Sequence, residues 1–302
     1  MPSIKKLLEN PSKLVFILDK LKLSKIIPDK PYLRMKFRAH MGKKLNLKNP
    51  QTFSEKLQWM KLYNRNPEYT KMVDKYEAKE YIEAIIGSEY IIPTLGVWDN
   101  VEDIDFDALP EQFVLKCTHD SGGLVICKDK SKLDIEKAKE TMRKALLSDF
   151  YFMGREWPYK NVPKRIIAEE YMEDTETGEL RDYKFFCFDG VVKALFVASD
   201  RQTEGEEVKF DFFDTDFNHL DFKNGHPNAT KEIKKPVTFE KMKEMAAKLS
   251  AGIPQVRVDF YEVDGKIYFG ELTFFHHDGM TPFDPEEWDY KFGEWINLPE
   301  KR

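Results

Sequence analysis

Two Asp-Gly pairs constrain the fold of this chain more than any other feature. Asp264-Gly265 separates residues 257–260 from residues 269–273, and Asp189-Gly190 separates two further β-like runs. An Asp-Gly pair between such runs is a strong hairpin signal, because both residues tolerate the positive φ angles of a tight turn. The sequence therefore predicts two antiparallel hairpins in the C-terminal half.

The hairpin around Asp264-Gly265 places two acids side by side. Asp259 lies on its first strand and Glu271 on its second, each among apolar neighbours. An unpaired carboxylate is costly in such surroundings. Two adjacent carboxylates favour a shared cation, and hard oxygen ligands favour Mg²⁺. This end of the chain therefore predicts a metal–nucleotide site.

A second segment offers the phosphate-binding half of such a site. Lys116 lies within the apolar run 112–117, and Ser121-Gly122-Gly123 follows five residues later. A lysine on a buried strand needs an anion, and a Ser-Gly-Gly turn lets backbone N–H groups approach phosphate oxygens. The segment is not a P-loop, because no Gly-Lys-Ser/Thr follows and the next run is β-like. We expect a nucleoside triphosphate here; an ordinary hairpin turn is the alternative.

A third segment is a β-like run that begins at Ile166 and ends in Glu169-Glu170-Tyr171-Met172. Such an end can offer backbone hydrogen bonds to an adenine edge and a carboxylate to ribose hydroxyls. The alternative is an ordinary strand terminus.

The rest of the chain predicts an α+β fold. Helical periodicity covers residues 3–26, divided by Pro11, and Thr52 to Glu55 resembles a capping box. A further helix is expected over residues 71–86, so the first ninety residues are mostly helical. The remainder mixes hairpins with helices, which favours α+β over a βαβ array. We expect a helical N-terminal region over residues 1–95 and a second domain over 96–302, in which helices cover 134–147 and 239–249 and residues 208–222 are extended.

Composition and charge limit the kinds of partner that this protein is expected to bind. The net charge of −5 gives no electrostatic case for nucleic acid. No apolar run is long enough to span a membrane, and the start of the chain lacks a signal-peptide pattern. Three cysteines without ligand spacing predict reduced core thiols and a cytoplasmic protein. Lysines crowd the N-terminal helical segment, which either packs on the domain or contacts a partner or the inner face of a membrane.

Taken in order, these segments resemble the ATP-grasp superfamily, and Val73-Asp74-Lys75 supplies the first lysine of its pattern. More narrowly, the chain resembles the TupA-like branch, which is associated with teichuronopeptide and polysaccharide biosynthesis. Thr273 departs from the family pattern, which usually has asparagine there. The narrower resemblance is carried by residues 48–59, 115–123, 181–186 and 270–274.

The resemblance implies two α+β lobes that grip ATP, preceded by a mostly helical region. Lys75 and Lys116 would neutralise phosphates, and Arg257 would hold a carboxylate and stabilise an oxyanion. Lys184 is either a phosphate contact or one half of a surface ion pair. His276 and His277 either line the acceptor pocket or form a plain loop. The implied nucleotide contacts also include Ser121, Gly122, Gly123, Glu169, Glu170, Tyr171 and Met172, and the implied Mg²⁺ ligands are Asp259, Glu271 and Thr273.

The implied activity is that of a carboxylate–amine ligase that works through an acyl phosphate. Its substrate would be a small molecule or polysaccharide precursor, with an amino acid or amine joined to a uronic acid or other carboxylate. A kinase-like phosphotransferase with the same grasp is one alternative. A glycosyltransferase is another alternative, because Asp214-Thr-Asp216 matches the Asp-x-Asp motif with which metal-dependent glycosyltransferases bind a nucleotide sugar.

Overall fold

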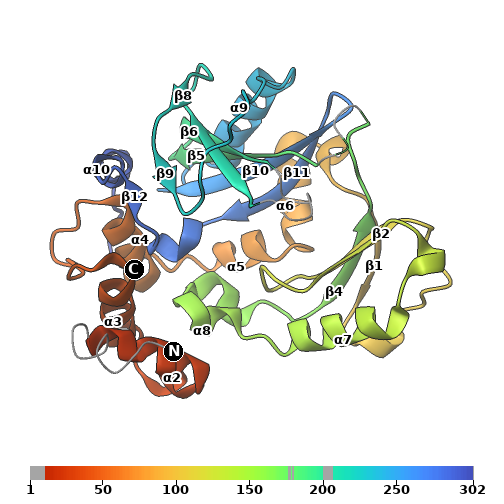
Figure 1. Ribbon diagram of the computed structural model, residues 1–302, viewed down its shortest axis with the longest axis horizontal. Coiled ribbons are helices and arrows are strands. Elements are labelled where there is room, and N and C mark those ends of the chain that lie inside the picture. Colours follow the sequence, from red (N-terminus) through yellow and green to blue (C-terminus); the bar gives the residue numbers. More distant parts are fainter. Residues whose placement is uncertain (1–10, 176–177, 179, 200–206, 302) are drawn as a thin grey trace.

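The computed structural model describes residues 11–175, 178, 180–199 and 207–301. Two large antiparallel sheets organise them, together with a two-stranded one formed by β12 and β9 (Figure 1). The smaller sheet has the order β1-β4-β2-β3, and the larger has the order β11-β10-β5-β6-β7-β8. The smaller sheet comprises β1 (Thr94–Trp98), β2 (Phe113–Cys117), β3 (Leu124–Cys127) and β4 (Ile166–Glu170). The larger comprises β5 (Asp182–Phe188), β6 (Val191–Ser199), β7 (Lys209–Phe213), β8 (His219–Leu220), β10 (Val256–Val263) and β11 (Lys266–Thr273).

Both predicted hairpins are confirmed. Asp189 and Gly190 connect β5 to β6 with φ angles of 47° and 80°. Asp264 and Gly265 connect β10 to β11 with φ angles of 50° and 73°. Positive φ at both turn residues matches the right-handed twist of the flanking strands, which explains why Asp-Gly occurs at both turns.

The N-terminal region is helical, as predicted. Residues 3–10 of the first predicted segment lie outside the described residues, and the part after Pro11 forms α2 (Leu14–Lys20) between two 3₁₀ turns. The capping box is confirmed: Thr52 accepts from the Glu55 N–H, and the Glu55 carboxylate accepts from the Thr52 N–H. Two longer helices follow, α3 (Asp29–Met41) and α4 (Phe53–Tyr63).

The single helix predicted over residues 71–86 is wrong. The chain instead forms α5 (Glu68–Val73) and α6 (Ala78–Ile86), with a break at Asp74. The Asp74 carboxylate accepts from the N–H groups of Tyr76 and Glu77 (2.8 and 3.2 Å), and the Lys75 N–H donates to the Thr118 carbonyl (3.2 Å). These bonds compete with the helical ones, and the break directs Lys75 toward the glycine-containing turn.

The remaining elements cover the sheets. Figure 1 shows α7 beside the smaller sheet, α9 beside the larger one, and α2 and α3 at the opposite end of the molecule from the smaller sheet. Residues 208–222 are extended only at their ends, because a loop separates β7 from β8. The other elements are α7 (Ile135–Leu146), α8 (Phe150–Gly154), α9 (Phe239–Leu249), α10 (Glu287–Glu294), β9 (Lys223–Asn224) and β12 (Phe283–Asp284).

Two hydrophobic cores hold these layers. The smaller one joins α7 to the smaller sheet, and the larger one joins the N-terminal helices to the larger sheet. Phe53 of α4 packs on Phe186 of β5, with ring centroids 6.2 Å apart. The predicted domain boundary at residue 95 falls within β1 and stays a prediction.

The three cysteines are buried and unpaired, as predicted. Among the described residues, no helix combines the length and apolar character needed to cross a bilayer.

Candidate functional site

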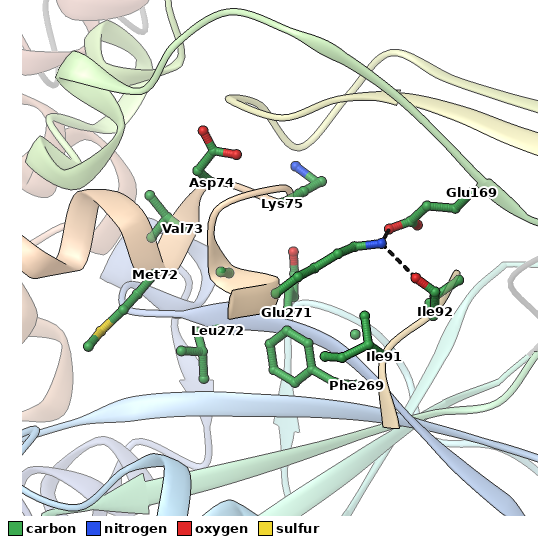
Figure 2. A pocket seen from close by; sticks show the side chains of 13 residues that line it. Met72, Val73, Asp74, Lys75, Ile91, Ile92, Glu169, Phe269, Glu271 and Leu272 are labelled. Atoms are coloured by element: carbon green, nitrogen blue, oxygen red, sulfur yellow. Dashed lines mark hydrogen bonds and ion pairs between the residues drawn. The ribbon is translucent and has the colours of Figure 1, made fainter. Parts of the chain in front are cut away.

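A pocket lies where the two sheets approach each other, and three of the predicted site residues line it. Lys75 comes from the break between α5 and α6, Glu169 from β4 and Glu271 from β11 (Figure 2). The cavity between these side chains has a volume of about 20 Å³, which is room for little more than a water molecule. Three of the predicted segments, which lie far apart in the sequence, therefore meet at one pocket, as the resemblance to the ATP-grasp pattern implies.

The two acids of the hairpin are cross-strand neighbours. Asp259 pairs in register with Glu271, and Arg257 pairs with Thr273. The Nη2 atom of Arg257 lies 2.7 Å from Asp259 Oδ2, 3.2 Å from Glu271 Oε1 and 2.9 Å from Thr273 Oγ1. The three predicted metal ligands thus converge on a single cationic nitrogen.

The two acids differ in their electrostatic setting. Asp259 is only 1% exposed, and this burial raises the pKa of its carboxyl against the opposing charges of Arg257 and Lys184. The Glu271 side chain is 40% exposed. Desolvation opposes its ionisation, but the charges of Lys184, Arg257 and Lys75 lower its pKa to about 2. Glu271 is therefore the accessible, negatively charged member of the pair.

A buried histidine, His276, holds the Arg257 side chain in place by a hydrogen bond. The Nη1 atom of Arg257 donates to His276 Nδ1 (2.7 Å), so Nε2 carries the ring proton and donates to Asn224 Oδ1 (3.0 Å). Burial and the neighbouring His277 hold the pKa of His276 well below its usual range. A neutral His276 accepts from Arg257 without repelling it. Asn224 was missed by the sequence analysis, since only the pairing of β9 with β12 brings it here.

Lys184 also belongs to this cluster. It lies opposite Asp259 on β5, forms an ion pair with it, and forms a second ion pair with Asp182 (2.6 Å). Lys184 is buried, so these are interior ion pairs and not the surface pair considered from the sequence.

On the smaller sheet, Glu169 holds two lysines. Lys116 forms an ion pair with one carboxylate oxygen, and Lys79 of α6 forms an ion pair with the other (2.8 Å). Burial opposes ionisation of Glu169, but these two charges lower its pKa. Lys79 also donates to the Ile92 carbonyl (2.7 Å). The sequence analysis missed Lys79, because nothing near it in the sequence distinguishes it from other helical lysines.

The glycine-containing turn lies beside Lys75, whose Nζ donates to the carbonyl of Asp120. Burial raises the pKa of the Asp120 carboxyl to about 6, against the charge of Lys75. Gly123 has a φ of 63°, and a Cβ there would lie 2.2 Å from the Cβ of Ala145 on α7. Only glycine fits at this position, while Ser121 and Gly122 are exposed.

The expected hinge continues past the strand. β4 ends at Glu170, and neither Glu170, Tyr171 nor Met172 is among the residues that line the pocket. The Tyr171 hydroxyl donates to Glu173. A nucleotide contact by these three residues stays a prediction.

Asp214, from the candidate nucleotide-sugar motif, and Asp278, which follows His277, both have structural roles. Asp214 accepts from the N–H groups of Asp216 and Asn218 (2.9 and 2.8 Å), so its carboxylate stabilises a turn. Asp278 pairs with Lys61 and, at 2.8 Å, with Lys36. In the part of the chain that the structure describes, no three His, Cys, Asp or Glu side chains are grouped closely enough to hold a metal.

A family model described as TupA-like ATPgrasp matches residues 55–297. A search of curated proteins gives no match.

Solved structures similar to this chain include three ligases or synthetases. The ATP-grasp ligase PsnB complexed with minimal precursor is 11% identical, with 74% of this chain and 60% of that chain covered and a TM-score of 0.41. D-alanine–D-alanine ligase from Bacillus anthracis complexed with ATP is 14% identical, with coverages of 73% and 55% and a TM-score of 0.39. D-cycloserine synthetase DcsG is 16% identical, with coverages of 75% and 69% and a TM-score of 0.42. The chain thus spans less than two thirds of the length of the first two structures.

Proposed function

The chain belongs to the TupA-like ATP-grasp family, and from this we propose that it is an ATP- and Mg²⁺-dependent carboxylate–amine ligase. The observation that carries the proposal is the meeting of Lys75, Glu169 and Glu271 in one pocket between the sheets. Lys75 can neutralise phosphate oxygens, and the carboxylate of Glu271 can bind a metal ion that the triphosphate carries.

The donor set fits Mg²⁺. Asp259, Glu271 and Thr273 already surround one cationic nitrogen of Arg257, at 2.7 to 3.2 Å. Mg²⁺ commonly takes one or two protein carboxylates and completes its shell with water and phosphate oxygens. We propose that these three residues hold it, and that the ion supplies neutralisation of the triphosphate charge.

The two lysines would hold the phosphates from the other side. Lys75 now donates to the Asp120 carbonyl and Lys116 pairs with Glu169. Both contacts can be exchanged for phosphate oxygens, which are stronger acceptors because they are charged. The Ser121–Gly123 turn would then close over the phosphates and exclude water, which would otherwise hydrolyse an acyl phosphate. Glu170, Tyr171 and Met172 would contact the adenosine.

The reaction begins when the substrate carboxylate attacks the γ-phosphorus, giving an acyl phosphate and ADP. An amine then attacks the acyl carbon, phosphate leaves and an amide forms. Arg257 would stabilise the oxyanion at Nη1, where His276 takes only one of the two N–H groups. Lys184 would add a further phosphate contact.

The substrate proposal rests on the family. The TupA-like branch is associated with teichuronopeptide and polysaccharide biosynthesis, so we propose a uronic acid or similar carboxylate, joined to an amino acid or amine. Calorimetry with ATP, in the presence and absence of Mg²⁺, tests nucleotide binding. A screen of carboxylates and amines for ADP release then tests the chemistry. ADP release that needs both substrates supports a ligase, whereas a stable phosphorylated product would show a phosphotransferase.

The N-terminal surface favours a membrane location for this activity. Leu21, Leu23 and Ile26 are 57%, 49% and 84% exposed, and Lys22 and Lys25 alternate with them. Apolar side chains interleaved with lysines suit a surface of anionic lipids. We propose that the protein is cytoplasmic and binds the inner face of the membrane here.

A further inference from the structure

Lys79 lines the same pocket as Lys75 and Glu169, and its ammonium group is fully occupied. It donates to the Ile92 carbonyl and to Thr94 Oγ1, both at 2.7 Å, and lies 2.8 Å from Glu169 Oε1. Figure 2 draws the contacts to Glu169 and Ile92 as dashed lines. Because an ammonium group has three N–H donors, these three acceptors use all of them.

Lys116 contacts the same carboxylate but keeps unused donors. Its ammonium group pairs with the other oxygen of Glu169, and among residues 11–175, 178, 180–199 and 207–301 it has no second partner. The remaining N–H groups of Lys116 can therefore turn toward a ligand without breaking a contact to the protein. Of the two lysines on Glu169, Lys116 is thus the one that can bind phosphate, and Lys79 is the one that stays.

The charges of these three groups do not cancel. Glu169 is 4% exposed, and the pairing of β4 with β1 and β2 places it between the two lysines. Two ammonium groups and one carboxylate leave one positive charge beside the pocket. Without the charge of Lys79, Lys116 and Glu169 would form a neutral pair. A phosphate would then have to take Lys116 from a carboxylate that would be left buried and unpaired, which is costly.

We propose that Lys79 is a positioning residue, which holds Glu169 by one oxygen so that Lys116 can leave the other oxygen and bind phosphate. This inference rests on the proposed function and gives a role in the same site to a residue outside its phosphate contacts. When Lys116 turns to a phosphate, Glu169 keeps one ion pair. Lys79 stays in place, because all three of its acceptors belong to the protein.

The alternative is that Lys79 only fastens α6 to the start of β1 and the end of β4. A role of that kind would affect every ligand of the pocket alike. The proposed role concerns the phosphates, so loss of Lys79 should weaken the binding of ATP more than that of AMP. A unit charge about 10 Å away, in an effective dielectric constant of about 20, changes the binding of one negative charge by roughly tenfold.

Calorimetry of the full chain with Mg–ATP and with AMP tests this role. Lys79→Met removes the charge and keeps most of the length of the side chain. Thr94→Val is the matched control, because it removes one acceptor of the same ammonium group and leaves the contact to Glu169. A double variant combines Lys79→Met with Glu169→Gln, so that Lys116 no longer has a carboxylate to neutralise it.

We expect Lys79→Met to raise the Kd of Mg–ATP roughly tenfold more than the Kd of AMP. Thr94→Val should leave the ratio of the two constants unchanged. The double variant should restore most of the wild-type ratio, because one positive charge again remains beside the pocket. Equal losses for both nucleotides, a double variant without recovery, or the same change in Thr94→Val would show that Lys79 only fastens the strands.

The wild-type chain separates this inference from the proposed function. If it binds Mg–ATP and the variants behave otherwise than expected, the role of Lys79 is wrong and the proposed function stands. If it binds neither nucleotide, the proposed function itself is overturned. Should Lys79→Met fail to fold, Lys79→Gln, which keeps a polar end for Ile92 and Thr94, decides the same comparison.

Discussion

Replacing Glu271 with glutamine should stop Mg²⁺-dependent turnover and leave the fold almost as stable as before. The side chain is 40% exposed, and its contacts to Arg257 Nη2 (3.2 Å) and Thr273 Oγ1 (3.1 Å) can be kept by the amide oxygen. Partly exposed ion pairs contribute about 0 to 1 kcal/mol, so we expect a loss of stability within about 1 kcal/mol. Weakened charge stabilisation at the metal position should lower kcat/KM by roughly 10² to 10³ or more.

Replacing Asp259 should have a different effect, because it should lower stability as well as activity. Asp259 is 1% exposed and accepts two hydrogen bonds from Arg257, both 2.7 Å long. Asp259→Asn leaves the buried Arg257 and Lys184 with less compensation, and breaking a buried pair costs about 3 to 5 kcal/mol. A loss of activity in Asp259→Asn could therefore come from the lost metal ligand or from the lost stability. Glu271→Gln separates these two causes, because its stability should change little.

Urea unfolding measures the two stabilities, and calorimetry of ATP binding across a Mg²⁺ series, together with ADP release, measures the function. The reasoning is refuted if Glu271→Gln retains near-wild-type turnover and Mg²⁺ dependence. It is also refuted if Glu271→Gln is destabilised as strongly as Asp259→Asn.

Three further predictions concern stability, pH and the membrane. Thr52→Ala removes the cap of α4 and should lower stability by about 1 kcal/mol in urea unfolding; an unchanged midpoint would contradict the capping role. The folded-state pKa of Asp120 is raised from 3.8 to about 6, so wild-type stability should fall relative to Asp120→Asn as pH rises between about 4 and 6; urea unfolding at both pH values would show no difference if Asp120 titrates normally. Ile26→Glu should weaken sedimentation with vesicles of anionic lipid, whereas Val237→Glu, at a site 86% exposed elsewhere, should not; equal effects would argue against an N-terminal membrane surface.

Local signals predicted much of the fold and part of the site. The Asp-Gly turns, the capping box and helix α9 depend on neighbouring residues, and all are found as predicted. The register of Asp259 with Glu271 also follows from one hairpin. In each case the deciding interactions lie within a short stretch of sequence.

The missed features depend on long-range contacts. The break at Asp74 requires Thr118 as a hydrogen-bond partner, and Lys79 becomes a site residue only because β4 carries Glu169 toward it.

The claim that a metal-bound triphosphate is gripped between the two sheets has one direct test. A structure of the protein with Mg²⁺ and a non-hydrolysable ATP analogue should show the metal among Asp259, Glu271 and Thr273, and phosphate oxygens at Lys75 and Lys116. A nucleotide bound elsewhere, or ion pairs of Lys116 and Arg257 that persist unchanged beside it, would contradict the account.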